Sequence, residues 1–222
     1  MDRADHFISE FKGNIPFIIS VRDDGFITKI DKQDLPFAKR KRKNDTGTAR
    51  LAATLKMMSK NFVPYFVFQQ VKRDRLTNEI RQNFYKRTLI LVYECLTKWN
   101  KCCLLDLHAF GTQIGLGQYD IIFGTDHRKT INNDFDTQLA KQLGGHLSNI
   151  TKELRIYVPE ERVTREERFG ATKVSTLTKW IKTNEPRVDA VQIEIYKDWL
   201  ANQAKLVALA MEFNFAICHF VR

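Results

Sequence analysis

Short apolar runs alternate with longer helical patterns along most of this chain, and that alternation constrains its fold more than any other feature. The run Ile-Pro-Phe-Ile-Ile-Ser-Val over 15–21 predicts a buried strand. Pro16 lies at its start, where a missing N–H group removes no hydrogen bond from the ladder. Leu51, Leu55 and Met58 then recur at helical spacing. Strands that alternate with helices in this way are typical of α/β proteins.

The rest of the chain continues the pattern. We expect further strands over 65–71, 104–108, 119–124, 154–158, 188–195 and 215–221, and helices over 48–60, 78–99, 137–150 and 198–213. The predicted fold class is a three-layer α/β domain, with a central, mostly parallel mixed sheet and helices on both faces. No repeat, low-complexity segment or linker interrupts the pattern, so residues 1–222 are expected to form a single domain.

Composition narrows the class of protein further. The 222 residues include 36 Lys and Arg against 26 Asp and Glu, which gives a formal net charge of +10. No uncharged apolar run approaches the roughly 18–20 residues that span a bilayer, and the N-terminus lacks a secretory signal pattern. We therefore expect a soluble, cytoplasmic protein with no membrane partner. The cysteines form no Cys-x-x-Cys pair, and Cys102 and Cys103 are expected to be buried thiols.

An acid and an imidazole lie together near the end of one predicted strand. In Leu-Leu-Asp-Leu-His over 104–108, Asp106 and His108 share a face because side chains alternate along a strand. Ligands of open α/β sheets bind beyond the carboxyl ends of the strands. Asp106 and His108 are therefore candidates for metal binding or acid–base chemistry. The alternative is a core histidine that is hydrogen-bonded to its neighbours.

Two other strand ends carry acids. Gln192 and Glu194 share one face of the run 188–195, and a carboxylate in so apolar a run must be paired, solvated or shifted in pKa, as a general base requires. The alternative there is an edge strand with one wet face. The first strand ends in Arg22-Asp23-Asp24-Gly25, where the two acids either form a turn or supply a metal ligand.

Taken in order along the chain, these motifs resemble those of the N-formylglutamate amidohydrolase family. The resemblance runs through roughly Ile15 to Leu200. It is carried mainly by Asp106-Leu-His108, by Asp120-Ile-Ile-Phe-Gly-Thr125 and by Ala-Val-Gln-Ile-Glu-Ile over 190–195. That family shares the fold and catalytic plan of the zinc carboxypeptidases. The resemblance therefore implies a metal-dependent amidohydrolase that cleaves an amide bond next to a carboxylate, in a small acidic N-acyl amino acid or a peptide-like substrate.

The same resemblance implies roles for individual residues. His108 would bind Zn²⁺ or another divalent metal, and Glu194 would be the catalytic base that activates the attacking water. Asp106 and Gln192 would support the site from beside these two residues. The family's first zinc-binding histidine is replaced here by Asp23. Asp23 is therefore a predicted metal ligand, and Asp45, which matches the family's acidic position after the first loop, is predicted to be another ligand or a polar support.

The family's Asn-Arg pair, which resembles the pair that holds a substrate carboxylate in carboxypeptidases, reads Asn78-Glu79 here. Asn78, with the nearby Arg73, Arg75 and Arg81, is therefore predicted to bind substrate. The reversed charge at Glu79 leaves the acyl group and the amino acid undecided. The sequence does not decide the oligomeric state either.

A second hypothesis rests on the basic run Lys39-Arg40-Lys41-Arg42-Lys43. A catalytically degenerate member of the family could bind an anion or a nucleic acid through this loop. No nucleic-acid-binding motif accompanies the run, so nucleic acid is the lesser of these alternatives. A solvated loop explains the same residues.

Overall fold

The structure is a computed structural model, and it describes residues 8–22, 47–69, 77–111, 119–143, 149–152, 154–158 and 176–221. These residues build one seven-stranded mixed sheet. Its strand order is β1 (Ile8–Phe11), β3 (Tyr65–Gln69), β2 (Phe17–Val21), β4 (Cys103–Phe110), β7 (Asp189–Tyr196), β5 (Ile121–Gly124) and β6 (Ile156–Tyr157). The central neighbours β3, β2, β4 and β7 are parallel, while β1 on β3 and β5 on β7 are antiparallel.

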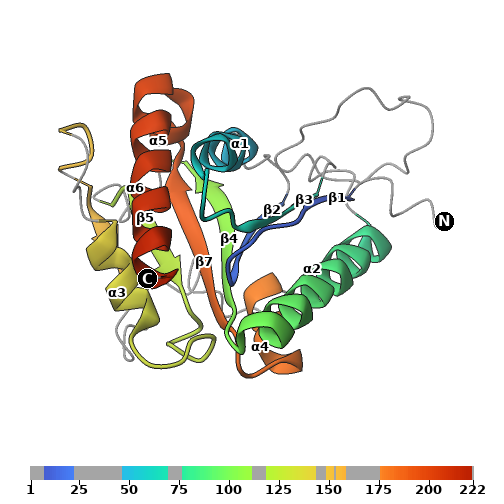
Figure 1. The fold of residues 1–222 in the computed structure, drawn as a ribbon. Helices are drawn as coiled ribbons and strands as arrows, with labels where there is room; N and C mark the ends of the chain where they lie inside the picture. The colour runs from blue at the N-terminus through green and yellow to red at the C-terminus, as the bar shows by residue number, and fades with distance from the viewer. Residues whose placement is uncertain are drawn as a thin grey trace, which may run out of the picture.

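Helices cover both faces of the sheet (Figure 1). One face carries α1 (Thr48–Met58), α3 (Phe135–Gln142), α5 (Lys197–Ala201) and α6 (Gln203–Val221). The other carries α2 (Asn78–Trp99) and α4 (Leu177–Asn184). The predicted three-layer α/β class with a mostly parallel mixed sheet is therefore confirmed.

Alternation along the strands separates two cores. In β2, β4 and β7, odd-numbered side chains such as Ile19, Leu105 and Val191 join the larger core under α1 and α6. Even-numbered side chains at the amino ends, among them Ile18 and Leu104, join the core under α2 and α4. Farther along the same strands the even-numbered positions become polar. The second core therefore ends where the polar residues at the carboxyl ends of the strands begin.

One predicted strand is wrong. Residues 215–221 continue α6 instead of forming a strand. Phe213, Ala216 and Ile217 are buried at a spacing of three and four residues, which is the helical period. The apolar run is therefore the buried stripe of a helix that packs on the larger core. The predicted helix over 198–213 is divided at Asn202 into α5 and α6.

Other boundaries differ less. Helix α2 has the predicted bounds, while α3 begins at Phe135 and ends at Gln142, short of the predicted 137–150. The sequence patterns did not indicate β1 or α4. Both are short and depend on packing against β3 and α2. The predicted buried thiols Cys102 and Cys103 are confirmed, with exposed fractions of 1% and 0%.

Within the described residues, α6 is the one helix that is long and apolar enough to cross a membrane, judged by length and composition. It carries eight buried residues, among them Leu206, Leu209 and Phe213, and these pack on the larger core. The length and composition of α6 are weak evidence for a membrane span, because a buried core helix can have the same length and composition.

Gly13 has no room for a side chain, because another segment of the backbone passes close to it. A Cβ atom there would lie under 3.0 Å from backbone atoms of Val63, Pro64 and Tyr65. We expect Gly13→Ala to lower the free energy of unfolding by about 1–3 kcal/mol, because this backbone leads directly into β3. Urea denaturation measures the change. The control is Gly111→Ala, whose Cβ would meet nothing within 4 Å. Equal effects of the two variants would contradict the prediction.

Asp120 joins the starts of β5 and β6. Its Oδ2 accepts from the backbone N–H of Arg155 at 3.0 Å and from Nε at 3.1 Å, and its Oδ1 accepts from the same guanidinium at 3.3 Å. Burial alone would raise the pKa of Asp120, but the hydrogen bonds from Arg155 and Trp199 outweigh it and lower that pKa.

A lowered pKa in the folded state stabilises the protein above the unfolded value of about 3.9. We therefore expect this contribution of Asp120 to be lost progressively as the pH falls below about 4. Urea denaturation between neutral and acid pH should show a smaller loss of stability on acidification in Asp120→Asn than in wild type. Arg155→Gln should likewise lose less stability on acidification than wild type does. Parallel pH profiles of all three proteins would refute the assignment.

Candidate active site at the carboxyl ends of β2, β4 and β7

Strand register brings the predicted site residues of β4 and β7 together. Asp106 pairs with Ser20 of β2 on one side and with Gln192 of β7 on the other. One step closer to the carboxyl edge, His108 pairs with Glu194. Neighbouring strands lie about 5 Å apart, so these side chains meet on the face covered by α2 and α4.

Asp106 is the centre of a buried polar network. It is fully buried, and its Oδ1 accepts a hydrogen bond from Ser20 Oγ at 2.6 Å. Its Oδ2 lies 2.9 Å from His108 Nε2 and 3.6 Å from a guanidinium nitrogen of Arg22. Burial alone would raise the pKa of Asp106, but the charges of His108 and Arg22 and the hydrogen bonds from His108 and Ser20 hold that pKa below its ordinary value.

Arg22 lies directly after β2 and is 8% exposed. One of its terminal nitrogens donates to Tyr85 Oη of α2 at 2.8 Å. The guanidinium carbon is 5.6 Å from the centre of the Tyr85 ring, and the other terminal nitrogen is 3.3 Å from His108 Nε2. Arg22 therefore brings a permanent positive charge to the polar network and links it to the covering helix.

The hydrogen-bond network assigns the proton of His108. The carboxylate of Asp106 can only accept, so Nε2 must carry a proton to bond to it at 2.9 Å. Arg22 can also only donate. Its terminal nitrogen, which lies 3.3 Å from Nε2 of His108, is therefore a second donor that faces the same oxygen of Asp106. In this arrangement Ser20 and His108 both donate to Asp106. Ser20 is thus bonded to the acid rather than to the imidazole that would activate it as a nucleophile.

Gln192 and Glu194 form the other half of the site. Gln192 Nε2 donates to Glu194 Oε1 at 2.7 Å, and the two residues are 6% and 7% exposed. The amide group thereby turns its oxygen away from the carboxylate. Gln192 Oε1 is buried and has no hydrogen-bond partner among the residues that the structure describes. A buried acceptor of this kind is suited to the N–H group of a ligand.

The described residues do not fit a zinc ion at Nε2 of His108. Zinc needs an unprotonated nitrogen, whereas this one donates to Asp106 and lies 3.3 Å from a guanidinium. No three His, Cys, Asp or Glu side chains of the described ranges gather into a metal-binding group. The other two predicted ligands, Asp23 and Asp45, lie outside the described residues.

The predicted substrate-binding residues divide in the same way. Arg73 and Arg75 lie outside the described residues, whereas Asn78 and Arg81 belong to the first turns of α2. This helix begins after Thr77, whose side chain accepts from the N–H of Ile80 at 3.2 Å. It returns the chain from the carboxyl end of β3 to the amino end of β4, so its first turns lie toward the carboxyl edge of the sheet.

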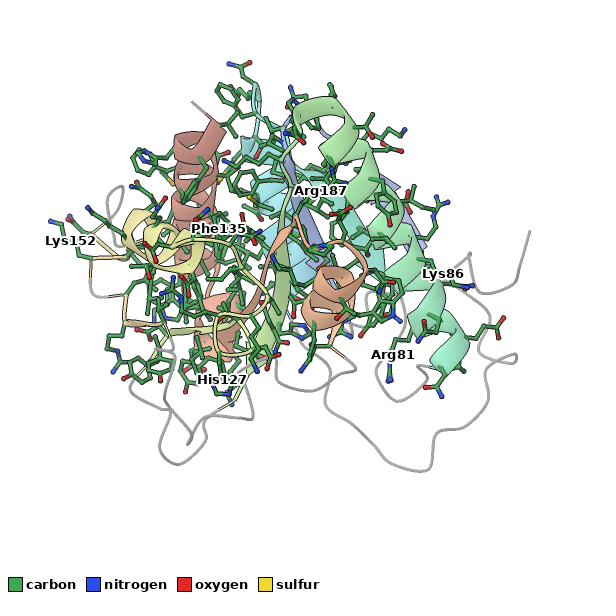
Figure 2. All side chains as sticks on the ribbon, turned by 90° about the horizontal axis from the view of Figure 1, so that it is seen from below. Arg81, Lys86, His127, Phe135, Lys152 and Arg187 are labelled. Carbon is green, nitrogen blue, oxygen red and sulfur yellow. The ribbon has the colours of Figure 1, made fainter. Side chains whose placement is uncertain are left out.

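Arg81 is half-buried, and it precedes Tyr85 by four residues, which places both on one face of the helix. Tyr85 is the residue whose hydroxyl holds Arg22. Figure 2 shows Arg81 near the start of α2, with the exposed Lys86 farther along the same helix. Asn78 is exposed at the first turn. Arg81 and Asn78 therefore lie at the end of α2 that is nearer the carboxyl edge of the sheet.

Sequence reasoning missed Arg22, Ser20 and Tyr85 as site residues. The sequence did contain a sign of Ser20 and Arg22. In the strand predicted over 15–21 and just beyond it, they lie on the same face as the apolar Ile18, and on that face they are the first polar residues. The register of β2 with β4 then places Ser20 opposite Asp106. Tyr85 carried no such signal, because it is one of several aromatic residues on a long amphipathic helix.

Comparison with known proteins gives a consistent result at the level of the fold. No family model matches the chain, and no curated protein matches it in sequence. Among solved structures, the N-formylglutamate amidohydrolase of Ralstonia eutropha JMP134 superposes with a TM-score of 0.65 at 10% identity, over 96% of each chain. A gene product of Agrobacterium tumefaciens superposes with a TM-score of 0.61 at 15% identity, over 96% of this chain and 93% of that one. The chain therefore has the α/β fold of these structures, and the polar residues at the carboxyl ends of β2, β4 and β7 form its candidate active site.

Proposed function

We propose that this protein hydrolyses an amide bond next to a carboxylate, in an N-acyl amino acid or a peptide-like molecule. The observation that carries the proposal is the pair on β7. The carboxylate of Glu194 lies beside Gln192, whose buried oxygen has no partner among the described residues. A base for water and an acceptor for an amide N–H are thus adjacent on one strand.

In the proposed reaction, Glu194 takes a proton from a water molecule as the water oxygen attacks the carbonyl carbon of the amide. The tetrahedral intermediate collapses with cleavage of the carbon–nitrogen bond. Glu194 then passes its proton to the leaving nitrogen, so the products are a carboxylic acid and an amine. Gln192 Oε1 would accept a hydrogen bond from the N–H group of the substrate amide. This bond would hold the plane of the amide next to the carboxylate of Glu194.

The positive side of the site would stabilise the negative charge that develops on the carbonyl oxygen. It consists of Arg22 and the protonated nitrogen of His108, both beside Asp106. The substrate carboxylate would lie toward Arg81 and Asn78, with Arg73 and Arg75 as further predicted contacts. Such a substrate also suits the net charge of +10.

Zinc, or another divalent metal, remains a prediction of the sequence resemblance. It would require Asp23 and Asp45 to complete a site with His108, and the ligand atom of His108 would have to be Nδ1, because Nε2 donates to Asp106. For that reason no step of the proposed reaction is assigned to a metal.

The test is an assay of the purified full chain against N-formyl, N-acetyl and other N-acyl amino acids and against glutamyl peptides. Release of a primary amine reports hydrolysis. We expect acidic substrates to be cleaved in preference to neutral ones. Absence of amine release across the whole set, with and without added zinc, would refute the proposal.

Arg81 gives the assay a specific prediction. We expect Arg81→Gln to raise KM for an acidic substrate about tenfold, with kcat little changed, because a charge-assisted hydrogen bond to the carboxylate contributes about 1.5 kcal/mol or more. The matched control is Lys86→Gln, which removes a positive charge from an exposed position farther along α2. The same increase in KM for both variants would show a general charge effect and would contradict a contact at Arg81.

A second candidate function is binding of the same class of molecule without cleavage. The observation that favours it is the permanent charge of Arg22 beside His108. Calorimetric binding of an N-acyl amino acid without release of its amine would support this candidate. The basic run 39–43, with its alternative of nucleic-acid binding, lies outside the described residues and remains a prediction.

A further inference from the structure

We infer that Arg22 is the resident cation of this site and keeps Asp106 and His108 in position without a divalent metal. The inference goes beyond the proposed hydrolysis, because it holds whether the site cleaves its ligand or only binds it.

Asp106 requires compensation for its charge. It is fully buried, and a buried carboxylate needs a positive partner or a sufficient set of hydrogen bonds. Arg22 lies 3.6 Å from Asp106 Oδ2 and is itself 8% exposed. The guanidinium therefore supplies, from within the chain, the positive charge that this position requires.

The same guanidinium nitrogen occupies the space beside the imidazole. It lies 3.3 Å from Nε2 of His108, the nitrogen that already donates to Asp106. A divalent ion at Nε2 would have to displace this proton and lie next to a permanent positive charge. At a separation of about 4 Å that repulsion is severe in a poorly solvated site.

Arg22 is also fixed on its far side. Its other terminal nitrogen donates to Tyr85 Oη at 2.8 Å, and Tyr85 is 1% exposed. The tyrosine ring packs against Trp180 of α4, with 5.5 Å between the ring centres. The guanidinium therefore spans from Tyr85 of α2 to the acid, and moving it aside would break its hydrogen bond to Tyr85.

The test begins with the metal content of the untagged full chain, after incubation with zinc and removal of loosely bound metal. We expect no stoichiometric zinc in wild type, and no change in its melting temperature with zinc or EDTA. A bound ion would raise the melting temperature by an amount that grows with the logarithm of the ratio of free ion concentration to Kd. About one zinc ion per chain, lost in His108→Ala, would overturn the inference.

A second measurement tests Arg22 itself. Arg22→Ala should melt at a lower temperature than wild type, and millimolar methylguanidinium should restore part of the difference by occupying the vacated position. The matched control is Tyr85→Phe, which removes one hydrogen bond but keeps the guanidinium, and which should show no such recovery. Absence of recovery in Arg22→Ala would overturn the assignment of Arg22 as the resident cation.

If Arg22→Ala does not fold, wild type alone still tests the inference. Nitrogen-15 spectra of the histidine rings should show His108 protonated at Nε2 and unchanged by added zinc. A zinc-dependent shift of the His108 signals would contradict it. None of these readouts requires activity, so failure to detect hydrolysis would not contradict the inference about Arg22. Bound zinc would contradict that inference but would not contradict the proposed hydrolysis.

Discussion

Replacement of Glu194 by Gln is expected to lower kcat for amide hydrolysis by a factor of about 10² to 10⁴. The amide group cannot take the proton of the attacking water, and it cannot return a proton to the leaving amine. Glutamine has nearly the same size and still accepts a hydrogen bond from Gln192 Nε2. The loss should therefore appear in kcat much more than in KM, measured as release of primary amine over a range of substrate concentrations.

The control for this variant is Glu212→Gln. Glu212 is also buried, but it lies on α6 on the opposite face of the sheet, where its Oε1 accepts from Thr151 Oγ1 at 2.6 Å. The same chemical change there should leave kcat unaltered and show only in stability. Glu194→Gln with wild-type kcat would refute Glu194 as the base. Loss of activity in both variants would instead indicate a general effect of removing a buried carboxylate.

The sequence predicted the four central strands because each is a short apolar run between longer helical patterns, but it did not predict their order in the sheet. The polar residues of β4 and β7 could be placed on one face from side-chain alternation alone. What it could not provide was register. That Asp106 faces Ser20 and Gln192, and that His108 faces Glu194, follows only from how the strands pair.

The role of Arg22 shows the same limit more clearly. In the sequence, Arg22 appears as the first residue of a charged turn. The two acids that follow it were the candidates for a turn or a metal ligand. Its function depends on Asp106, which belongs to a different strand, and on Tyr85, which no strand pattern connects with it. Local patterns do not carry contacts between residues so far apart in the chain.

The incorrect strand over 215–221 has a different cause. A short apolar run fits a buried strand and the buried face of a helix equally well. Contact with the larger core decided the matter, since Phe213, Ala216 and Ile217 all lie on the covered side of α6. Tertiary packing therefore determined an element that its own residues left undecided.

Replacement of Arg22 by Met is expected to lower the free energy of unfolding by about 3 kcal/mol. Methionine fills a similar volume but leaves the fully buried carboxylate of Asp106 without its guanidinium partner. Urea denaturation at neutral pH measures the change. The matched control is Arg87→Met, which breaks the exposed ion pair between Arg87 and Glu10 (2.6 Å, with the arginine side chain 48% exposed) and should cost about 0.5 kcal/mol.

A double variant separates the charge from the packing of the arginine side chain. Asp106→Asn in the Arg22→Met background removes the uncompensated charge, while the oxygen of the new amide group would still accept from Ser20. If the loss in Arg22→Met comes from a stranded charge, the double variant should be more stable than Arg22→Met by about 1–2 kcal/mol, although the same Asp106→Asn change destabilises wild type. Additive effects of the two changes would show that Arg22 stabilises the protein through packing alone. In that case the buried carboxylate would have to obtain its compensation from His108 and Ser20, and the case for a resident cation at this site would fail.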